Sequence, residues 1–329
     1  MRAPDFWSHN DGSARLLSLA LAPASFVYGA SVAWKAKRAT PHRAKAKVVC
    51  IGNLTVGGSG KTPVCLAIAH ALAAHRLHTV ILSRGYGGRA RGPIFVRPET
   101  DSAADVGDEA LMEAASTHVI VARDRRAGAE LADAKETDVL VMDDGHQNFS
   151  LAKNLSLVVV DAEMGFGNSC VLPAGPLREP VAQGLSRADA VILVGNGSPD
   201  LRGFAKPVLR AHLSAVDSGF TKKRVVAFAG IGRPEKFFTS LRNLGAEVVA
   251  EAIFPDHHFY TASEIARLKA KAQTAKASLV TTEKDYVRLT PAERVGIDYL
   301  RIEALFDDPS AIEAMLDKLW PDAIPRRSQ

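Results

Sequence analysis

The chain has 329 residues, of which 47% are hydrophobic and 23% are charged. This composition excludes a disordered, collagen-like or low-complexity protein, and the length predicts two domains of roughly 150 residues each. The three cysteines, Cys50, Cys65 and Cys170, are widely separated and lack the CxxC spacing that is typical of zinc sites. We therefore expect a reducing compartment, with neither a disulfide framework nor a zinc motif.

The formal net charge of +5 is concentrated at the N-terminus. Residues 1–50 contain eight basic and two acidic side chains, a local charge of +6, so the remaining residues sum to −1. A protein that binds nucleic acid over a broad surface distributes its basic side chains more widely. We therefore expect no nucleic-acid partner.

Residues 16–34 form an uncharged stretch, LLSLALAPASFVYGASVAW. Pro23 lies in its middle and should kink or split a helix. A stripe of small, semi-polar residues recurs at helical spacing: Ser18, Ala22, Ser25 and Gly29. Trp34 and the basic residues of 35–47 follow where an interfacial anchor would place them. We predict one or two helices lying on the cytoplasmic leaflet; a helix buried against the first domain and a spanning helix are the alternatives.

Short apolar runs then predict buried strands of a parallel sheet at residues 46–52, 79–82, 119–122, 139–142, 157–160 and 190–194. A helix is predicted at 63–74, with Pro63 in its first turn, and helical patterns separate several of the later strands. This alternation predicts a doubly wound, mostly parallel α/β sheet of the P-loop NTPase type, with ligands at the carboxyl ends of its strands.

A second βαβ-like stretch begins at residue 224. It comprises a strand at 224–232, a helix at 234–244, a strand at 246–254, a helix at 263–275 and a strand at 278–282. The strand 206–213 and the polar turn 216–223 form the join, which places the boundary near residue 215. We therefore predict a membrane-associated helical segment at 1–45, a P-loop domain at 46–215 and a smaller α/β domain at 216–329.

The strongest motif is TVGGSGKT at residues 55–62, which matches the P-loop pattern G-x-x-x-x-G-K-[ST] except at its first position. It follows an apolar strand and opens a helix, the context in which backbone N–H groups bind phosphate. Lys61 would reach the β- and γ-phosphates, and the Thr62 hydroxyl would ligate Mg²⁺. A glycine-rich turn with an exposed lysine is the alternative. The expected nucleotide contacts are Thr55, Gly57, Gly58, Ser59, Gly60, Lys61 and Thr62.

Two aspartates, Asp143 and Asp144, end the apolar run at 139–142 and precede Gly145. Acids at the tip of a strand in a P-loop protein are the Walker B arrangement, which holds Mg²⁺ directly or through water. Adjacent carboxylates also repel each other unless a cation lies nearby. The pattern favours a metal site, and a simple turn is the alternative.

Two further groups carry chemistry-bearing side chains. Asp108 and Glu109 open a helix predicted at 109–115, where helix capping alone would explain them. Asp256, His257 and His258 follow the strand at 246–254, but no third or fourth ligand is spaced to complete a metal site. Transfer of a phosphoryl group to an alcohol requires a base for the hydroxyl proton, and the residues alone do not indicate which acid serves.

Taken together, the motifs resemble one family, the tetraacyldisaccharide 4′-kinases of lipid A biosynthesis. The matching strings occur in the family's order, and the basic-flanked N-terminal segment and the Thr at the first P-loop position also fit. These strings are GNLTVGGSGKTP (52–63), SRGYGGR (83–89), VGDEALM (106–112), ARDRRAGA (122–129), DDGHQN (143–148), LPAGPLREP (172–180), AGIGRPEKFF (229–238), FPDHHFY (254–260) and TTEKDYVRL (281–289).

The resemblance implies transfer of the ATP γ-phosphate to the 4′-hydroxyl of an acylated glucosamine disaccharide 1-phosphate, which gives lipid IVA. It implies Asp108 and His257 as a catalytic dyad, assembled when the smaller domain closes over the first. It implies Lys61 and Thr62 on phosphate and Mg²⁺, with Asp143 and Glu109 supporting the metal. With Asp144 of the strand-tip pair, the expected metal residues are Thr62, Glu109, Asp143 and Asp144. ATP, Mg²⁺, a glycolipid substrate and the cytoplasmic face of the bacterial inner membrane are the expected partners, and a monomer is expected.

Some residues of these strings have no derived role. Many members carry a histidine where this chain has Asn148, and His146 precedes it, so neither is assigned to catalysis. Arg84, Arg89 and Arg178 could contact phosphate or stabilise loops. The TEKD string at 282–285 follows an apolar strand, as base-recognition loops of GTP-binding relatives do; a solvated turn is the favoured interpretation. The competing functions are a P-loop GTPase or metallochaperone, and a membrane-tethered nucleotide-binding scaffold without catalysis.

Overall fold

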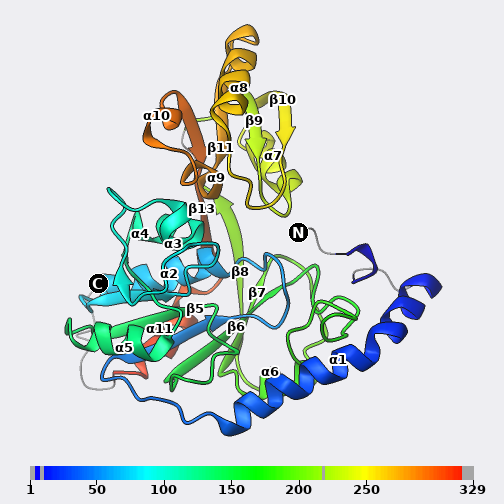
Figure 1. Cartoon of the computed structure of the whole chain (residues 1–329), viewed down its shortest axis with the longest axis vertical. Helices are drawn as coiled ribbons and strands as arrows, with labels where there is room; N and C mark the ends of the chain where they lie inside the picture. Colours follow the sequence, from blue (N-terminus) through cyan, green and yellow to red (C-terminus); the bar gives the residue numbers. More distant parts are fainter. Residues whose placement is uncertain (1–3, 8–10, 217–218, 321–329) are drawn as a thin grey trace.

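The computed structural model describes residues 4–7, 11–216 and 219–320; the remaining parts of the predicted ranges 1–45 and 216–329 lie outside the described residues. The chain forms a large lower body and a smaller upper body (Figure 1). A nine-stranded sheet of order β13-β8-β7-β6-β1-β5-β2-β4-β3 organises the first, and a four-stranded sheet of order β10-β9-β11-β12 organises the second. The predicted α/β fold class is confirmed.

The large sheet is parallel except at its two edges, where β3 and β13 pair antiparallel to β4 and β8. Its central strands are completely buried, which agrees with their continuous apolar runs, and the predicted strands end within two residues of the observed ones. The strands are β1 (Lys47–Gly52), β2 (Thr79–Ser83), β3 (Ile94–Phe95), β4 (His118–Val121), β5 (Val139–Asp143), β6 (Leu155–Asp161), β7 (Ala190–Val194), β8 (Val208–Ala215) and β13 (Ile302–Phe306).

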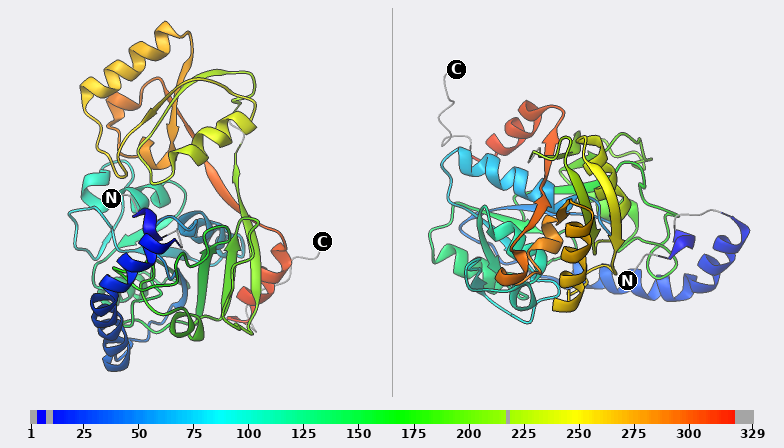
Figure 2. Two further views of the ribbon diagram at one scale, coloured as in Figure 1. Left: turned by 90° about the vertical axis from the view of Figure 1, so that its right-hand side faces the viewer. Right: turned by 90° about the horizontal axis from the view of Figure 1, so that it is seen from above.

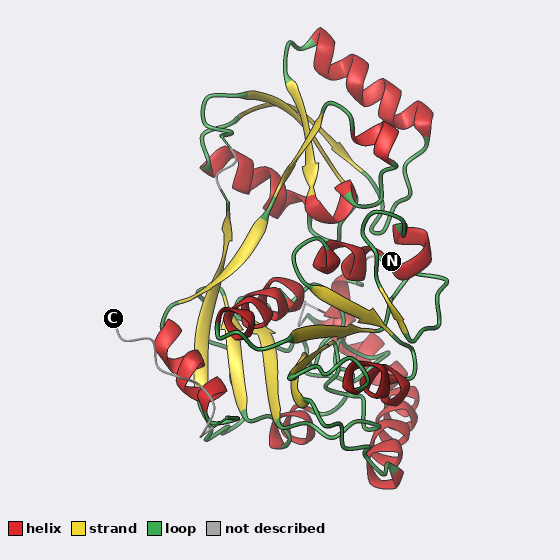
Figure 3. Ribbon diagram, turned by 90° about the vertical axis from the view of Figure 1, so that its left-hand side faces the viewer, coloured by secondary structure: helices red, strands yellow, loops and turns green. Residues whose placement is uncertain are grey.

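Helices cover both faces of this sheet (Figure 3). Helix α2 begins at Lys61, two residues before the prediction, and its Val64, Ile68 and Leu72 belong to the core that faces β1, β2 and β5. The helices of this body are η1 (Asp5–Trp7), α1 (Gly12–Arg38), α2 (Lys61–Ala74), α3 (Ala103–Val106), α4 (Asp108–Ala114), α5 (Arg125–Asp133), α6 (Val181–Ser186) and α11 (Pro309–Asp317).

The small sheet is parallel throughout and carries a separate apolar core on each face. Val225 and Ala227 of β9 point to one core, whereas Val226 and Phe228 point to the other, as strand alternation requires. Its elements are β9 (Arg224–Ala229), α7 (Pro234–Asn243), β10 (Glu247–Ile253), α8 (Ala262–Thr274), β11 (Ser278–Thr282), α9 (Glu283–Tyr286), α10 (Pro291–Arg294) and β12 (Ile297–Leu300).

Two adjacent strands join the bodies. β8 leaves the large sheet toward the small one, and β13 returns to pair with it along Ala211–Ala215 and Ile302–Phe306 (Figure 2). The C-terminal residues 302–317 therefore belong to the large body, as strand β13 and helix α11, whereas the sequence assigned them to a domain spanning 216–329. The small domain is an insertion between two paired strands, and an edge strand that returns from far along the chain has no local sequence signal.

Helix α1 runs along the outside of the large body as one unbroken helix that includes Pro23 (Figure 1). Of the one or two helices that were expected, the structure has one, so a split at Pro23 is excluded. Among the described residues, α1 is the helix long and apolar enough to cross a membrane, and its apolar window is not buried in the protein. The alternative of a buried helix is also wrong, because Leu16, Leu19 and Phe26 are 70%, 71% and 78% exposed.

The other side of α1 rests on the segment 168–175. The Ser18 hydroxyl donates to the Ala174 carbonyl at 3.1 Å, and the Ser25 hydroxyl accepts from the Ala174 N–H at 3.1 Å. The Asn168 amide donates to both the Ser18 hydroxyl and the Ala174 carbonyl. Part of the predicted stripe of small residues therefore faces the protein, whereas Ala22 is exposed.

Candidate active site

The phosphate loop connects β1 to α2 at the carboxyl edge of the large sheet. Gly60 caps α2 with a φ of 80°, and Gly57 has a φ of 105°, a region that residues with a Cβ rarely adopt. Lys61 opens the helix, and its Nζ lies 3.7 Å from Oδ1 of Asp144. The arrangement presents a helix N-terminus and a cation to one space, which is what a phosphate group requires.

The phosphate loop is bonded to residues 176–178, which directly follow the segment 168–175 beneath α1. The Val56 N–H donates to the Pro176 carbonyl at 2.9 Å, and the Arg178 N–H donates to the Leu54 carbonyl at 2.7 Å. On the inner side, the Asn53 amide donates to the Ser59 hydroxyl at 3.1 Å. A continuous hydrogen-bonded segment thus links the exposed N-terminal helix to the phosphate loop.

Asp144 is neutralised by two cations. Nη1 of Arg178 lies 2.8 and 2.9 Å from its two carboxylate oxygens. Burial would raise the pKa of Asp144, but Lys61 and Arg178 hold the pKa below its usual value. Arg178, whose role the sequence left open, thus pairs with a strand-tip carboxylate in this structure.

Asp143 ends β5 in a different environment. Its side chain is buried, and Oδ1 has no hydrogen-bond partner among the described residues. Burial, with added repulsion from Glu109 and Asp144, raises the pKa of Asp143 to about 7. A carboxylate oxygen without a partner, surrounded by other acids, fits a divalent cation, because Mg²⁺ prefers oxygen ligands and would relieve the repulsion.

The two domains meet at Asp108 and His257. Asp108 is the first residue of α4, and His257 lies in the loop after β10 with a φ of 58°. The His257 Nδ1 lies 2.9 Å from Asp108 Oδ2, although the two residues are 149 positions apart in sequence. Gly107 has a φ of 91°, and a Cβ there would lie 2.5 Å from the Tyr86 carbonyl, so glycine permits the close approach that fixes Asp108.

Arg288 is a residue of this site that the sequence analysis missed. Its Nε donates to Asp108 Oδ2 at 2.9 Å, and its Nη1 donates to Asp285 Oδ1 at 2.6 Å and to the Gly230 carbonyl at 2.8 Å. The Arg288 side chain is 1% exposed. Burial would raise the pKa of Asp108, but hydrogen bonding to His257 and the charges of Lys284 and Arg288 hold it well below its usual range, so the carboxylate is ionised.

The interpretation of TEKD as a solvated turn is wrong. Asp285 is completely buried and accepts hydrogen bonds from Tyr260, Arg288 and the Gly230 N–H. Lys284 reaches across the domain boundary to Glu109 at 3.0 Å. The signal lay in the string TTEKDYVRL, where Asp285 and Arg288 are spaced i, i+3 on one helical turn.

The remaining candidates are dispersed. His146 is buried between the Ser156 hydroxyl and the Gly184 carbonyl, and burial lowers its pKa to about 3, so it is a neutral structural group. Arg89 pairs with Asp105 on the surface, and Arg84 is exposed.

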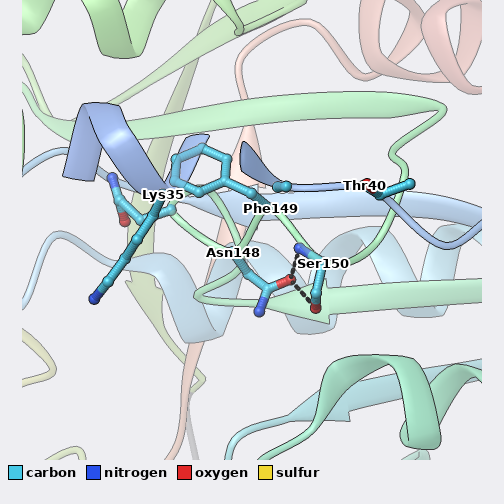
Figure 4. Close-up of a pocket in the computed structure, with 7 residues that line it drawn as sticks. Lys35, Thr40, Asn148, Phe149 and Ser150 are labelled. Atoms are coloured by element: carbon cyan, nitrogen blue, oxygen red, sulfur yellow. Dashed lines mark hydrogen bonds between the residues drawn. The ribbon is translucent and has the colours of Figure 1, made fainter. Parts of the chain in front are cut away.

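Asn148 lines a separate pocket of about 330 Å³ below the end of α1 (Figure 4). Its amide oxygen accepts from the N–H and hydroxyl of Ser150. The other lining residues are Lys35, Ala39, Thr40, Gln147 and Phe149. The role of Asn148 here is a turn-stabilising one.

Comparison with known proteins places this geometry in context. The sequence profile of the tetraacyldisaccharide-1-P 4′-kinase family matches residues 17–320. The chain belongs to this family. The tetraacyldisaccharide 4′-kinase of Rhodospirillum rubrum is 46% identical and covers 99% of this chain and 100% of the relative. The tetraacyldisaccharide 4′-kinase of Gluconacetobacter diazotrophicus is 48% identical, and the match covers 98% of this chain and 99% of the relative.

A solved structure is also similar. It is the crystal structure of the "apo" form of LpxK from Aquifex aeolicus in complex with ATP, with a TM-score of 0.76 at 25% sequence identity. The similarity covers 92% of this chain and 99% of the other. The resemblance to tetraacyldisaccharide 4′-kinases inferred from the sequence is therefore confirmed.

Proposed function

We propose that this tetraacyldisaccharide 4′-kinase family member transfers the γ-phosphoryl group of ATP to the 4′-hydroxyl of tetraacyldisaccharide 1-phosphate, giving lipid IVA. The observation that carries the proposal is the contact of His257 with Asp108, which joins an imidazole to a carboxylate across the domain boundary. Family membership supplies the substrate class, and the ATP bound by the Aquifex aeolicus relative supports the phosphoryl donor.

The phosphate loop binds the triphosphate in this proposal. Backbone N–H groups of residues 55–62 and the N-terminus of α2 attract the phosphate oxygens, and the glycines allow the close approach. Lys61 contacts the β- and γ-phosphates in this proposal, and its Nζ lies 3.7 Å from Asp144, so the cation also faces the strand-tip acids.

Thr62, Glu109, Asp143 and Asp144 are the proposed magnesium ligands, directly or through water. The unpartnered Oδ1 of Asp143 is the strongest support among them. When bound, Mg²⁺ neutralises charge on the β- and γ-phosphates and so stabilises the transition state. Lys284 holds Glu109 from the second domain, which links the ligand set to domain closure.

His257 acts as the base that removes the hydroxyl proton. Because Asp108 is ionised and can only accept a hydrogen bond, the Nδ1 of His257 must carry the proton that faces it, which leaves Nε2 as the basic atom. Nε2 takes the proton of the 4′-hydroxyl as its oxygen attacks the γ-phosphorus, and ADP leaves with the electron pair of the broken P–O bond. Arg288 positions Asp108, and the ring of Tyr86 packs edge-on to His257 at 5.7 Å.

The exposed face of α1 attaches the enzyme to the cytoplasmic face of the inner membrane. Leu16, Leu19 and Phe26 project from this helix, and its last turn carries three basic residues that suit anionic headgroups. Withdrawing a tetraacylated lipid into water costs about 0.8 kcal/mol of transfer free energy for each exposed CH₂ group. Attachment at the interface avoids this cost.

The test is incubation of the full chain with γ-labelled ATP, Mg²⁺ and tetraacyldisaccharide 1-phosphate in micelles, followed by chromatography of the lipid. We expect label in a lipid with one added phosphate at the 4′ position. ATP binding without labelled lipid would contradict the proposal and favour a non-catalytic scaffold. Preference for GTP over ATP in a competition binding assay would favour the GTPase alternative.

A further inference from the structure

A group of three side chains that can act as metal ligands lies buried in the large body, and the strand-tip acid Asp143 is one of them. Cys65 of α2, Glu113 of α4 and Asp143 of β5 each offer one ligand atom, and these atoms all lie within 4.8 Å of one another. The three residues come from three different elements and are at most 4% exposed. The fold therefore brings a thiol and two carboxyl groups together in its interior.

These groups have few partners of their own. Both carboxyl oxygens of Glu113 and Oδ1 of Asp143 are buried and lack a hydrogen-bond partner among the described residues. Arg125 is the buried cation nearby, but its guanidinium donates to the backbone carbonyls of Ala122 and Asp143 rather than to either carboxylate. A buried carboxyl group without a partner is costly, so a ligand that satisfies three such oxygens would stabilise the cluster.

We propose that Cys65, Glu113 and Asp143 form a second metal site, for a divalent transition metal of the Zn²⁺ class. Thiolate and carboxylate are both Zn²⁺ ligands, and three protein ligands leave the fourth position open. The thiol distinguishes this site from a magnesium site, because Mg²⁺ takes oxygen ligands in octahedral geometry. Because Asp143 ends β5 at the phosphate loop, a metal ion enters the proposed site from the nucleotide side.

Sharing Asp143 has a consequence for catalysis. A Zn²⁺ ion at this site draws the Asp143 carboxylate away from Mg²⁺, so the metal inhibits phosphoryl transfer, and Mg²⁺ with ATP opposes its binding. This effect rests on the proposed function, whereas metal binding itself does not. The two parts are therefore tested by separate measurements.

Binding is tested with Co²⁺ as a spectroscopic substitute for Zn²⁺, added to the nucleotide-free full chain in detergent. We expect one equivalent to bind with a thiolate-to-cobalt absorption band in the near ultraviolet. The Cys65→Ala variant should lose the band, and Glu113→Gln should bind Co²⁺ at least about tenfold more weakly. Cys170→Ser is the matched control, because its thiol lies outside the cluster, and should retain the band.

The proposal is overturned if the wild-type protein shows no thiolate band at saturating Co²⁺, or if the band survives in Cys65→Ala. In the activity arm, Zn²⁺ should inhibit the wild-type protein and inhibit Cys65→Ala at least about tenfold less. Equal inhibition of both proteins would overturn the proposed competition between the two metals for Asp143. A thiolate band in a protein that never labels lipid would support the site while contradicting the kinase function.

Discussion

Replacement of Arg288 by methionine tests the buried network that joins the two domains. The Arg288 side chain is 1% exposed, and methionine keeps an unbranched side chain there. It removes the guanidinium, which donates to Asp108, Asp285 and the Gly230 carbonyl. Asp108 and Asp285 are 6% and 0% exposed. The variant therefore leaves two buried carboxylates without their shared cation.

The magnitude follows from this burial. Removing one partner of a buried ion pair costs about 3–5 kcal/mol, because the remaining charge is neither solvated nor paired. We expect Arg288→Met to lower the free energy of unfolding by about this amount in urea titrations followed by circular dichroism. Its transfer rate should fall as well, because Asp108 would no longer be held toward His257.

Arg126→Met is the matched control. Arg126 bonds Glu130 at 2.8 Å, but the two side chains are 62% and 51% exposed. Exposed pairs contribute at most about 1 kcal/mol, so this variant should resemble the wild-type protein. If both variants lost equally little stability, the network would not hold the domains together and the reasoning from burial would be refuted.

Three further predictions follow from other parts of the fold. Three hydrogen bonds lower the pKa of Glu264 to about 2, so the stability that they contribute is complete above its unfolded pKa of 4.5 and is lost as the pH falls toward 2. The stability deficit of Glu264→Gln, measured by urea titration, should therefore shrink over that range. Phe26→Asp should weaken binding to anionic vesicles by about tenfold or more, whereas Val295→Asp, equally exposed on the small domain, should not. Lys61→Ala should raise the Kd for ATP by about tenfold or more in calorimetry, and an unchanged Kd would contradict the phosphate-loop assignment.

Much of the fold could be predicted because its signals are local. The central strands are buried on both faces, so their apolar runs are continuous, and the string before Lys61 combines glycines with a strand and a helix in one short segment. Asp143 and Asp144 were expected to lie near this loop because the carboxyl ends of parallel strands meet at one edge of the sheet.

The rest depends on contacts that no local pattern contains. Arg288 lies 180 positions from Asp108, and only the folded chain shows that one guanidinium serves carboxylates of both domains. Asp285 occurs among polar residues typical of a turn, but it is completely buried because its carboxylate accepts four hydrogen bonds that compensate its charge. Glu113 follows Glu109 by one helical turn and looks like a solvated residue, yet it faces the interior.

The pairing of Asp108 with His257 is the central claim, and a single-turnover transfer measurement at saturating ATP tests it most directly. Asp108→Asn and His257→Ala should each slow transfer to the glycolipid by about 10²- to 10⁴-fold while the Kd for ATP stays within about threefold of wild type. His258→Gln, which alters the neighbouring imidazole that bonds Glu264, should transfer at close to the wild-type rate. Wild-type transfer rates in both dyad variants would contradict the account. So would slower transfer that is fully explained by a weaker Kd for ATP.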